Sequence, residues 1–476
     1  MQPHAPDRLG RSALPSSALL GASAGAGTGI VHLGLGQFHR AHQAVATALA
    51  LAGAGDDDWG IVGVAHRSPT VARALAEQDH LYSVLTLDPE DERADVVDVH
   101  REALVAALDP EAVIARIADP RHRVVSLTIT ESGYLADPQS DPTCMIGLLA
   151  QGLARRAASQ APLAVVSCDN VSSNGTTTRA AVIGWLERSG VASSVIDEVV
   201  AHTTFPNTMV DRIVPGTTDR TRARVAELLG VDDRVPVPAE RFSMWVLEDS
   251  FPAGRPHWEA AGAVFSSEVD RFEDLKLLVL NGMHSLISYT GALAGAVTIP
   301  EAWALDWVKA AVHAAIEREC RPVLTAPTGF DVDAWVAQLH RRWQNTTLGD
   351  RIARVGSDGS SKLPQRLPRP ALGALARDEV PHLAALTTAA WICCIAPPEG
   401  FAPGPVADQM DEPLRARLVE LTRGLSGLER VRGVVGAVLP GLVDHDAFVS
   451  RVAELVEVIT RAGIAAAATH AVEEHA

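Results

Sequence analysis

The sequence predicts an α/β protein, with a doubly wound parallel sheet in its first half and a mostly α-helical domain in its second. Short apolar runs rich in β-branched residues alternate with helical stretches from residue 30 to about 265. That alternation is typical of a parallel sheet with helices on both faces. A glycine turn follows the first of these runs. From about residue 272 the strand signals fade and long Ala- and Leu-rich segments dominate, which indicates a helical domain.

The chain of 476 residues is long enough for two domains. We expect a flexible N-terminal tail over residues 1–28, because this stretch is rich in Ala, Gly, Ser and Pro. It also lacks a basic stretch followed by a continuous apolar core, so it does not have the pattern of a secretory signal. The sheet domain is then expected over residues 29–271 and the helical domain over 272–476.

Each element is predicted from its local pattern. Strands are expected over 30–33, 59–64, 124–129 and 163–167, with a helix over 41–52. Polar loops follow the last two strands, at 130–133 and 168–170, and ligands of parallel sheets bind at the carboxyl ends of the strands. In the second domain we expect helices over 272–295, 301–320, 332–343, 371–395, 411–423 and 445–462.

Composition excludes several classes of function. The formal net charge is -17, whereas nucleic acids and anionic membrane surfaces require basic patches. No run of 18 apolar residues exists, so we predict no membrane span. The five cysteines form no C-x-x-C pair, which argues against a disulfide framework or a structural zinc site. We therefore expect a soluble cytoplasmic protein.

The glycine turn has the context of a dinucleotide-binding fingerprint, since it follows an apolar strand and opens a helix. Gly34 permits a tight turn, and Gly36 lets the backbone approach a pyrophosphate. His39 replaces the third glycine of the G-x-G-x-x-G pattern, so this is a variant. The alternative is an ordinary turn between a strand and a helix.

The end of the second strand leaves the choice of cofactor open. A carboxylate that bonds the adenosine ribose is expected there, yet none occurs between Val64 and Glu77. Arg67 lies in this stretch and suits the 2′-phosphate of NADP. The commoner alternative is that Arg67 is a solvated surface residue. NAD and NADP are both compatible with the sequence at this point.

A lysine in the first helix of the second domain is the strongest candidate for chemistry. The chain holds only three lysines, Lys276, Lys309 and Lys362, among 41 basic residues. At about 100° per residue, Glu273, Lys276, Asn281 and His284 fall within an arc of roughly 140° on a helix that is otherwise apolar. Burial lowers the pKa of a lysine from about 10.4 toward neutrality, where the amine acts as a general base.

The alternative for this helix is a structural Lys–Glu pair beside a core histidine. Two other dehydrogenase chemistries can be excluded from the sequence. None of the three tyrosines has a lysine four residues later, so the Tyr-x-x-x-Lys mechanism is absent. No cysteine and histidine cluster has the spacing of a catalytic zinc site. A lysine base without a metal remains.

Seven ordered motifs together resemble the long-chain mannitol dehydrogenases, and the likeness runs from about residue 30 to about 370. They are GLGQFHRAHQ at 34–43, TITE at 128–131, SCDN at 167–170, FPNTMVDR at 205–212, WVLED at 245–249, K-x4-N-x2-H at 276–284 and SDGSSK at 357–362. The resemblance implies a Rossmann-type domain followed by a mostly helical domain, with the active site in the cleft between them.

The resemblance also implies roles for individual residues. Lys276 corresponds to the general base, Glu273 to a proton-relay carboxylate and His284 to a ligand of a substrate hydroxyl. Asn281 and Asn170 correspond to amides that stabilise the alkoxide, a task that suits uncharged donors. For Asn170 the alternative is an amide that caps its loop.

Further positions are expected to contact the substrate or the cofactor. By resemblance, Asp211, Arg354 and Lys362 bind substrate; the alternative for Asp211 is a turn-capping carboxylate beside Arg212. The expected cofactor-binding residues are Gly34, Gly36, Phe38, Arg67 and Glu131.

The sequence thus predicts a metal-independent NAD(P)-dependent oxidoreductase that interconverts a polyol and a ketose. NAD is the expected cofactor, and NADP is a possible one. The alternative is a sugar-acid oxidoreductase of the same family, such as fructuronate reductase (D-mannonate oxidoreductase), because residues 364–366, Pro-Gln-Arg, resemble relatives that act on sugar acids. A non-catalytic dinucleotide-binding sensor is a more remote alternative. The presence of Lys276, Asn281, His284 and Asn170 argues against it. We expect a monomer or a small homo-oligomer.

Overall fold

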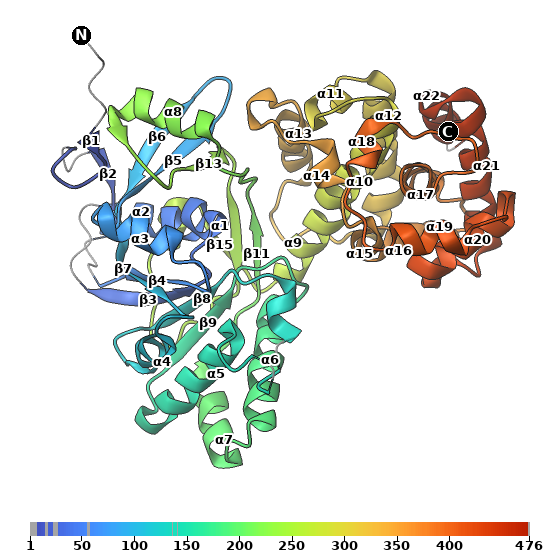
Figure 1. Cartoon of the computed structure of the whole chain (residues 1–476). Helices are drawn as coiled ribbons and strands as arrows, with labels where there is room; N and C mark the ends of the chain where they lie inside the picture. Colours follow the sequence, from blue (N-terminus) through green and yellow to red (C-terminus); the bar gives the residue numbers. More distant parts are fainter. Residues whose placement is uncertain are drawn as a thin grey trace, which may run out of the picture. The chain divides into compact units, whose positions relative to one another are not determined.

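The computed structural model describes residues 7–14, 18–21, 27–54, 58–135, 137–139 and 141–474. Backbone contacts divide the chain into two compact units, Met1–Asp270 and Arg271–Ala476. In Figure 1 the first unit runs from blue to green and the second from yellow to red. Every named strand of the described residues lies in the first unit, here the sheet domain, and the second is the helical domain.

A six-stranded, fully parallel sheet forms the centre of the sheet domain, in the order β10-β9-β8-β3-β4-β7. Counted along the chain, the first of these strands lies in the middle and the order reverses beside it, which is the doubly wound arrangement. The predicted fold class is therefore confirmed. The strands are β3 Thr28–Leu33, β4 Gly60–Ala65, β7 His100–Val105, β8 Val124–Leu127, β9 Leu163–Ser167 and β10 Thr203–Thr204.

Alternate residues of these strands supply two apolar cores, one on each face of the sheet. Ile30 belongs to one core and its neighbour Val31 to the other, because successive side chains of a strand point to opposite faces. A sheet buried on both faces has near-continuous apolar strands, which is why β3, β4, β8 and β9 were predicted, whereas β7 and β10 were not. The helices around the sheet are α2 Gln43–Ala54, α3 Thr70–Glu77, α4 Pro110–Ala118, α5 Met145–Arg156, α6 Asn174–Arg188 and α7 Ser193–His202.

Three smaller sheets complete this domain, and the sequence pattern did not predict them. A mixed sheet has the order β13-β5-β6-β2, a second sheet the order β11-β14-β15, and β1 pairs with β12. The strands not yet named are β1 Asp7–Arg8, β2 Leu19–Leu20, β5 Tyr82–Leu87, β6 Arg93–Val97, β11 Thr208–Asp211, β12 Val231–Asp232, β13 Val237–Glu240, β14 Met244–Leu247 and β15 Val264–Phe265. Two helices lie among them, α1 Gln37–Ala41 and α8 Asp219–Leu229.

The expected flexible tail over residues 1–28 is wrong for its described parts. Asp7–Arg8 pairs with Val231–Asp232, and Leu19–Leu20 pairs with Val96–Val97. Leu9 is buried at 1% exposure. The physical reason is that two short strand edges of the domain are available for pairing, and leucines near them bury apolar area. Residues 1–6, 15–17 and 22–26 lie outside the described residues.

The helical domain surrounds α17 (His382–Ile395), in which every residue is buried. Such a helix is apolar all round because neighbouring helices cover every face. The expected helices over 272–295 and 301–320 are each interrupted by a π-helix, at Lys276–Asn281 and Ala315–Cys320, which corrects the prediction of regular helices. The other helices are α9 Val269–Leu275, α10 Gly282–Leu293, α11 Ile299–Trp303, α12 Asp306–Ala314, α13 Val332–Trp343, α14 Ile352–Val355, α15 Gly359–Arg366, α16 Pro368–Leu375, α18 Pro405–Asp408, α19 Arg415–Leu421, α20 Gly427–Val438, α21 Asp446–Ala462 and α22 Ile464–Glu473.

None of the helices in the described part of the chain combines the length and the apolar character that a membrane crossing requires.

Candidate active site

The glycine turn lies at the carboxyl end of β3, where the strand order of the sheet reverses. Gly34 has φ +105, a conformation that side chains rarely adopt, and a Cβ atom there would overlap the carbonyl oxygen of Thr128. The Thr128 hydroxyl donates to the Gly34 carbonyl at 2.8 Å. The turn is therefore fixed against the end of β8, and only glycine fits at position 34.

Gly36, unlike Gly34, has open space around its backbone. It is exposed, and a Cβ atom there would lie 3.8 Å from the nearest atom, the Gly34 carbonyl oxygen. Space for a ligand thus remains next to its backbone. Phe38, two residues further on, is half-buried and stacks on His42 at 5.1 Å between ring centroids. His39 stands where the fingerprint has its third glycine. Its imidazole ring is buried and stacks on His32 at 3.3 Å between ring centroids, so a packed side chain occupies this position.

Asp169 joins the loops after β8 and β9, and the sequence analysis did not assign it a role. Its carboxylate accepts the backbone N–H groups of Ile129 and Thr130 at 3.1 and 3.0 Å and the Tyr134 hydroxyl at 2.6 Å. The two flanking candidates, Glu131 and Asn170, are exposed at the ends of these adjacent strands. Asp169 therefore holds their loops side by side, and its place in the SCDN motif was the signal for it.

The loop after β4 carries Arg67 and Ser68, both exposed. The Arg67 guanidinium lies 3.3 Å from Asp141, in an ion pair of which the arginine side chain is 76% exposed. A pair this exposed contributes little to stability, so Arg67 can exchange Asp141 for another anion. Asp211, by contrast, is 6% exposed at the end of β11. It is the last residue of that strand and pairs with Met244.

The lysine helix, which here means α9, the segment Lys276–Asn281 and α10 together, differs from the predicted geometry in two ways. The segment Lys276–Asn281 is a π-helix, so the angle of 100° per residue does not apply there. Its buried side is formed by Leu278, Val279 and Leu280, while Glu273, Lys276, Asn281 and His284 are half-buried. Lys276 is therefore half-buried, whereas the apolar pattern of the helix predicts a buried lysine, because only one side of the segment faces the core of the helical domain. His284 packs edge-on against Trp343 at 6.0 Å.

The two candidate substrate cations lie on consecutive short helices. Arg354, on α14, is 62% exposed and pairs with the buried Asp350. The Lys362 ammonium, on α15, donates to the Ser357 carbonyl at 2.7 Å. Lys362 and Arg366 are four residues apart on α15 and hence on one face of that helix. Arg366 donates to the Asn281 carbonyl at 3.0 Å, so this face of α15 meets the lysine helix.

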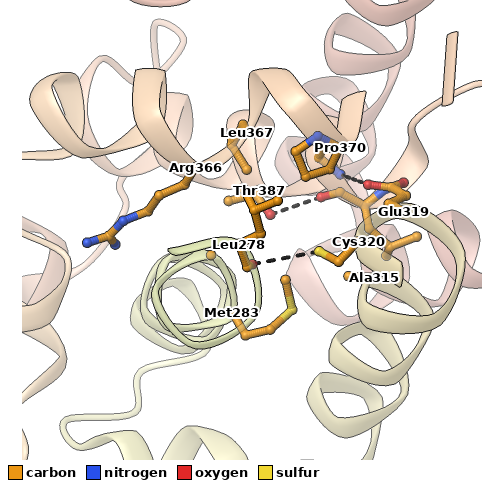
Figure 2. A pocket seen from close by; sticks show the side chains of 12 residues that line it. Leu278, Met283, Ala315, Glu319, Cys320, Arg366, Leu367, Pro370 and Thr387 are labelled. Atoms are coloured by element: carbon orange, nitrogen blue, oxygen red, sulfur yellow. Dashed lines mark hydrogen bonds between the residues drawn. The ribbon is translucent and has the colours of Figure 1, made fainter. Parts of the chain in front are cut away.

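A small cavity lies behind the lysine helix (Figure 2). Its volume of about 10 Å³ leaves room for roughly one water molecule, far less than a six-carbon substrate needs. Glu319 lines it and accepts the backbone N–H groups of Leu383 and Ala384 at 2.7 and 2.9 Å, and burial raises the pKa of Glu319 to about 7. The cavity therefore belongs to the packing of α17 and is no substrate pocket.

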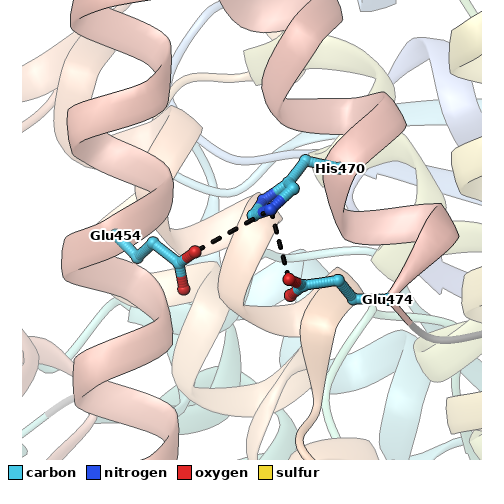
Figure 3. Close-up of side chains that lie close together, drawn as sticks. All are labelled: Glu454, His470 and Glu474. Atoms are coloured by element: carbon cyan, nitrogen blue, oxygen red, sulfur yellow. Dashed lines mark ion pairs between the residues drawn. The ribbon is translucent and has the colours of Figure 1, made fainter.

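Within the described ranges, one set of His and carboxylate side chains is close enough for a metal ion, namely Glu454, His470 and Glu474 (Figure 3). Glu454 lies on α21, and His470 and Glu474 lie in and just after the last turn of α22. None of the predicted site residues belongs to these two helices. The Arg451 guanidinium contacts Glu454 at 2.8 Å and Glu474 at 2.7 Å. This one cation pairs with both carboxylates, so the group forms an ion-pair network.

Comparisons with known proteins agree with this architecture. Residues 28–260 match the family model of the mannitol dehydrogenase Rossmann domain, and residues 268–460 match that of the mannitol dehydrogenase C-terminal domain. D-mannonate oxidoreductase of Escherichia coli (strain K12) is 36% identical over 442 residues, which are 88% of this chain and 89% of that protein. Mannitol 2-dehydrogenase of Cereibacter sphaeroides is 37% identical over 384 residues, 76% of this chain and 80% of that protein.

Solved structures are similar over almost the whole chain. The ternary complex of Pseudomonas fluorescens mannitol 2-dehydrogenase with NAD and D-mannitol has a TM-score of 0.81 and 30% identity, covering 98% of this chain and 100% of that one. A substrate-free D-sorbitol dehydrogenase has a TM-score of 0.85 and 27% identity, covering 97% and 99%.

Proposed function

Because the chain belongs to the mannitol dehydrogenase family of oxidoreductases, we propose that it interconverts a polyol and a ketose with NAD(P) and uses Lys276 as the general base. The observation that carries the proposal is the half-buried polar side of the lysine helix, where Lys276, Asn281 and His284 lie on a segment that is otherwise apolar. A side chain with partial burial loses water while it stays accessible to a substrate, which suits an amine that exchanges protons.

The proposed division of labour follows from the chemistry of each group. Lys276 removes the proton of the reacting hydroxyl, and Glu273 passes that proton on toward solvent. Asn281 and Asn170 donate amide hydrogen bonds to the oxygen as negative charge develops on it. His284 bonds a substrate hydroxyl. A bound nicotinamide would supply the acceptor for the hydride, so that the alcohol carbon would be oxidised by two electrons.

The sheet domain fits a dinucleotide at the carboxyl ends of β3, β8 and β9. The open space beside Gly36 suits the close approach of a pyrophosphate to the backbone. Phe38, Arg67 and Glu131 are the further proposed cofactor contacts, and each is half-buried or exposed. NAD is the proposed cofactor, which the similarity to the NAD complex of mannitol 2-dehydrogenase supports. That the active site lies between the two domains stays a prediction.

A second candidate function is the oxidation of a sugar acid such as D-mannonate. The relative named D-mannonate oxidoreductase matches 88% of this chain, more than the 76% matched by the Cereibacter mannitol 2-dehydrogenase. Arg354 and Lys362 are the proposed substrate-binding cations, together with Asp211, and two cations suit a carboxylate as well as hydroxyl groups. We further propose a cytoplasmic location, since all five cysteines are free and buried. A monomer or small homo-oligomer stays a prediction.

A panel assay distinguishes these functions. Purified protein is mixed with NAD+ or NADP+ and with mannitol, sorbitol, arabinitol, mannonate or another aldonate, and the reduced nicotinamide is measured. Turnover of a polyol supports the first function, and turnover confined to the aldonates supports the second. The reverse reaction with the matching ketoses and keto-acids checks the direction. Failure of every substrate in both directions would contradict a catalytic function.

We expect activity to be independent of a metal ion. Among the described residues, the one group with suitable ligand spacing is the Glu454–His470–Glu474 network, in which Arg451 already pairs with both carboxylates. Dialysis against a strong chelator should therefore leave kcat unchanged, while a zinc-dependent alcohol dehydrogenase treated in parallel loses its activity. Loss of turnover that zinc restores would exclude the proposed lysine mechanism.

The loop after β4 should set the cofactor preference. Ser68 is exposed beside Arg67, and residues 65–76 contain no carboxylate that could bond the ribose of NAD. We expect Ser68→Asp to favour NAD over NADP about tenfold or more in the ratio of kcat/KM, because one charged hydrogen bond is worth roughly 1–3 kcal/mol. Ser189→Asp, at the end of α6, is the matched control for an added surface charge. An unchanged ratio in Ser68→Asp would place the adenosine ribose elsewhere.

A further inference from the structure

The π-helical segment Lys276–Asn281 changes which side chains of the lysine helix lie on the same side. In a regular α-helix, residues five apart point about 140° away from each other. In a π-helix the hydrogen bond joins residues five apart, so Lys276 and Asn281 lie one turn apart on the same side. This arrangement matters for the proposed reaction, in which both side chains act on the same substrate oxygen.

The π-helix leaves backbone acceptors that must be satisfied in another way. The Gly282 N–H group, which an α-helix would give to the Leu278 carbonyl, donates to the Leu277 and Val279 carbonyls instead. The Leu278 carbonyl accepts the Cys320 thiol at 3.7 Å, as Figure 2 shows. A buried carbonyl without a hydrogen-bond donor costs free energy, so the contact with the Cys320 thiol stabilises the π-helical segment.

Arg366 secures the other end of the segment. Its Nη1 donates to the Asn281 carbonyl at 3.0 Å and to the Ser285 hydroxyl at 2.9 Å. Hydrogen bonds from a charged donor are stronger than neutral ones, and this pair joins the last π residue to the first turn of α10.

We propose that Arg366 is a positioning residue, which keeps the Lys276–Asn281 segment in its π form and thereby aligns the base with the amide. Arg366 acts through the Asn281 backbone rather than on the substrate. The inference rests on the proposed function, because alignment matters only if Lys276 and Asn281 act together.

Steady-state kinetics of Arg366→Met test the proposal. We expect kcat to fall about 100-fold, since a displacement of about 1 Å costs that much, with KM for the substrate within threefold of the parent. Arg366→Lys restores one hydrogen bond and should recover part of kcat, as should guanidinium ions added to the Met variant. Arg415→Met is the matched control, because Arg415 also bonds backbone carbonyls, those of Cys394, Ala407 and Met410, and it should leave kcat within threefold of the parent.

The outcomes separate this proposal from its premise. An inactive parent enzyme would contradict the proposed function itself. An active parent whose Arg366→Met variant keeps kcat would contradict the positioning role alone. Equal losses in Arg366→Met and Arg415→Met, with equally lowered Tm, would reduce Arg366 to a structural residue. A rise in KM confined to aldonates, with kcat unchanged, would make Arg366 a carboxylate ligand and overturn the proposal.

Discussion

Replacing Lys276 by alanine should lower kcat by about 10²–10⁴-fold, the usual contribution of a general acid or base. The side chain is half-buried, so its loss opens little space in the apolar core, and we expect Tm to change by only a few degrees. Turnover is measured at a pH where proton removal limits the rate. Small primary amines added to Lys276→Ala should restore part of the activity, more so for amines of higher pKa.

Lys309→Ala is the matched control, because Lys309 is the lysine without a proposed role. Its side chain is 42% exposed and pairs with Asp306 on the same helix. This substitution should leave both kcat and Tm unchanged. If Lys276→Ala also kept turnover within tenfold of the parent, a loss of only about 1.4 kcal/mol of barrier stabilisation, Lys276 would not be the base.

Replacing Gly34 by alanine should destabilise the sheet domain strongly. The new Cβ would overlap the Thr128 carbonyl oxygen, and φ +105 is unfavourable for any side chain. Backbone strain of this kind costs about 1–3 kcal/mol before the overlap is counted, so we expect the free energy of unfolding to fall by about 3 kcal/mol or more. Urea unfolding followed by tryptophan fluorescence measures the change.

Replacing Gly36 by alanine tests cofactor binding at this turn separately from the stability of the fold. Gly36 has φ -92, and its Cβ would lie no closer than 3.8 Å to the nearest atom, so stability should stay the same. If a pyrophosphate approaches this backbone, Kd for NAD should nevertheless rise. Normal stability in Gly34→Ala would mean that the turn can adopt a negative φ, and an unchanged Kd in Gly36→Ala would place the cofactor away from the turn.

Part of the fold could be predicted because its signals are local. The strands around the glycine turn are continuous apolar runs, since a parallel sheet is buried on both faces. Some missed strands depend on distant partners: β13 (Val237–Glu240) pairs with β5 (Tyr82–Leu87), more than 100 residues earlier. The local hairpin of β5 and β6 was missed as well. The ordered part of the N-terminal segment was missed because its composition is that of a flexible tail while its pairing partners lie elsewhere in the chain.

The candidate site divides in a similar way. By itself, the sequence determined which residue types are present at which spacing, and hence the glycine turn, the lone lysine among apolar residues and the family. Only the tertiary structure decided how these residues are oriented. The π form of Lys276–Asn281 is absent from a hydrophobic pattern, because a segment with a buried apolar side has similar composition in either helix. Its orientation depends on Cys320 and Arg366, which lie 42 and 85 positions from the carbonyls they bond, and such contacts form only when the chain is folded.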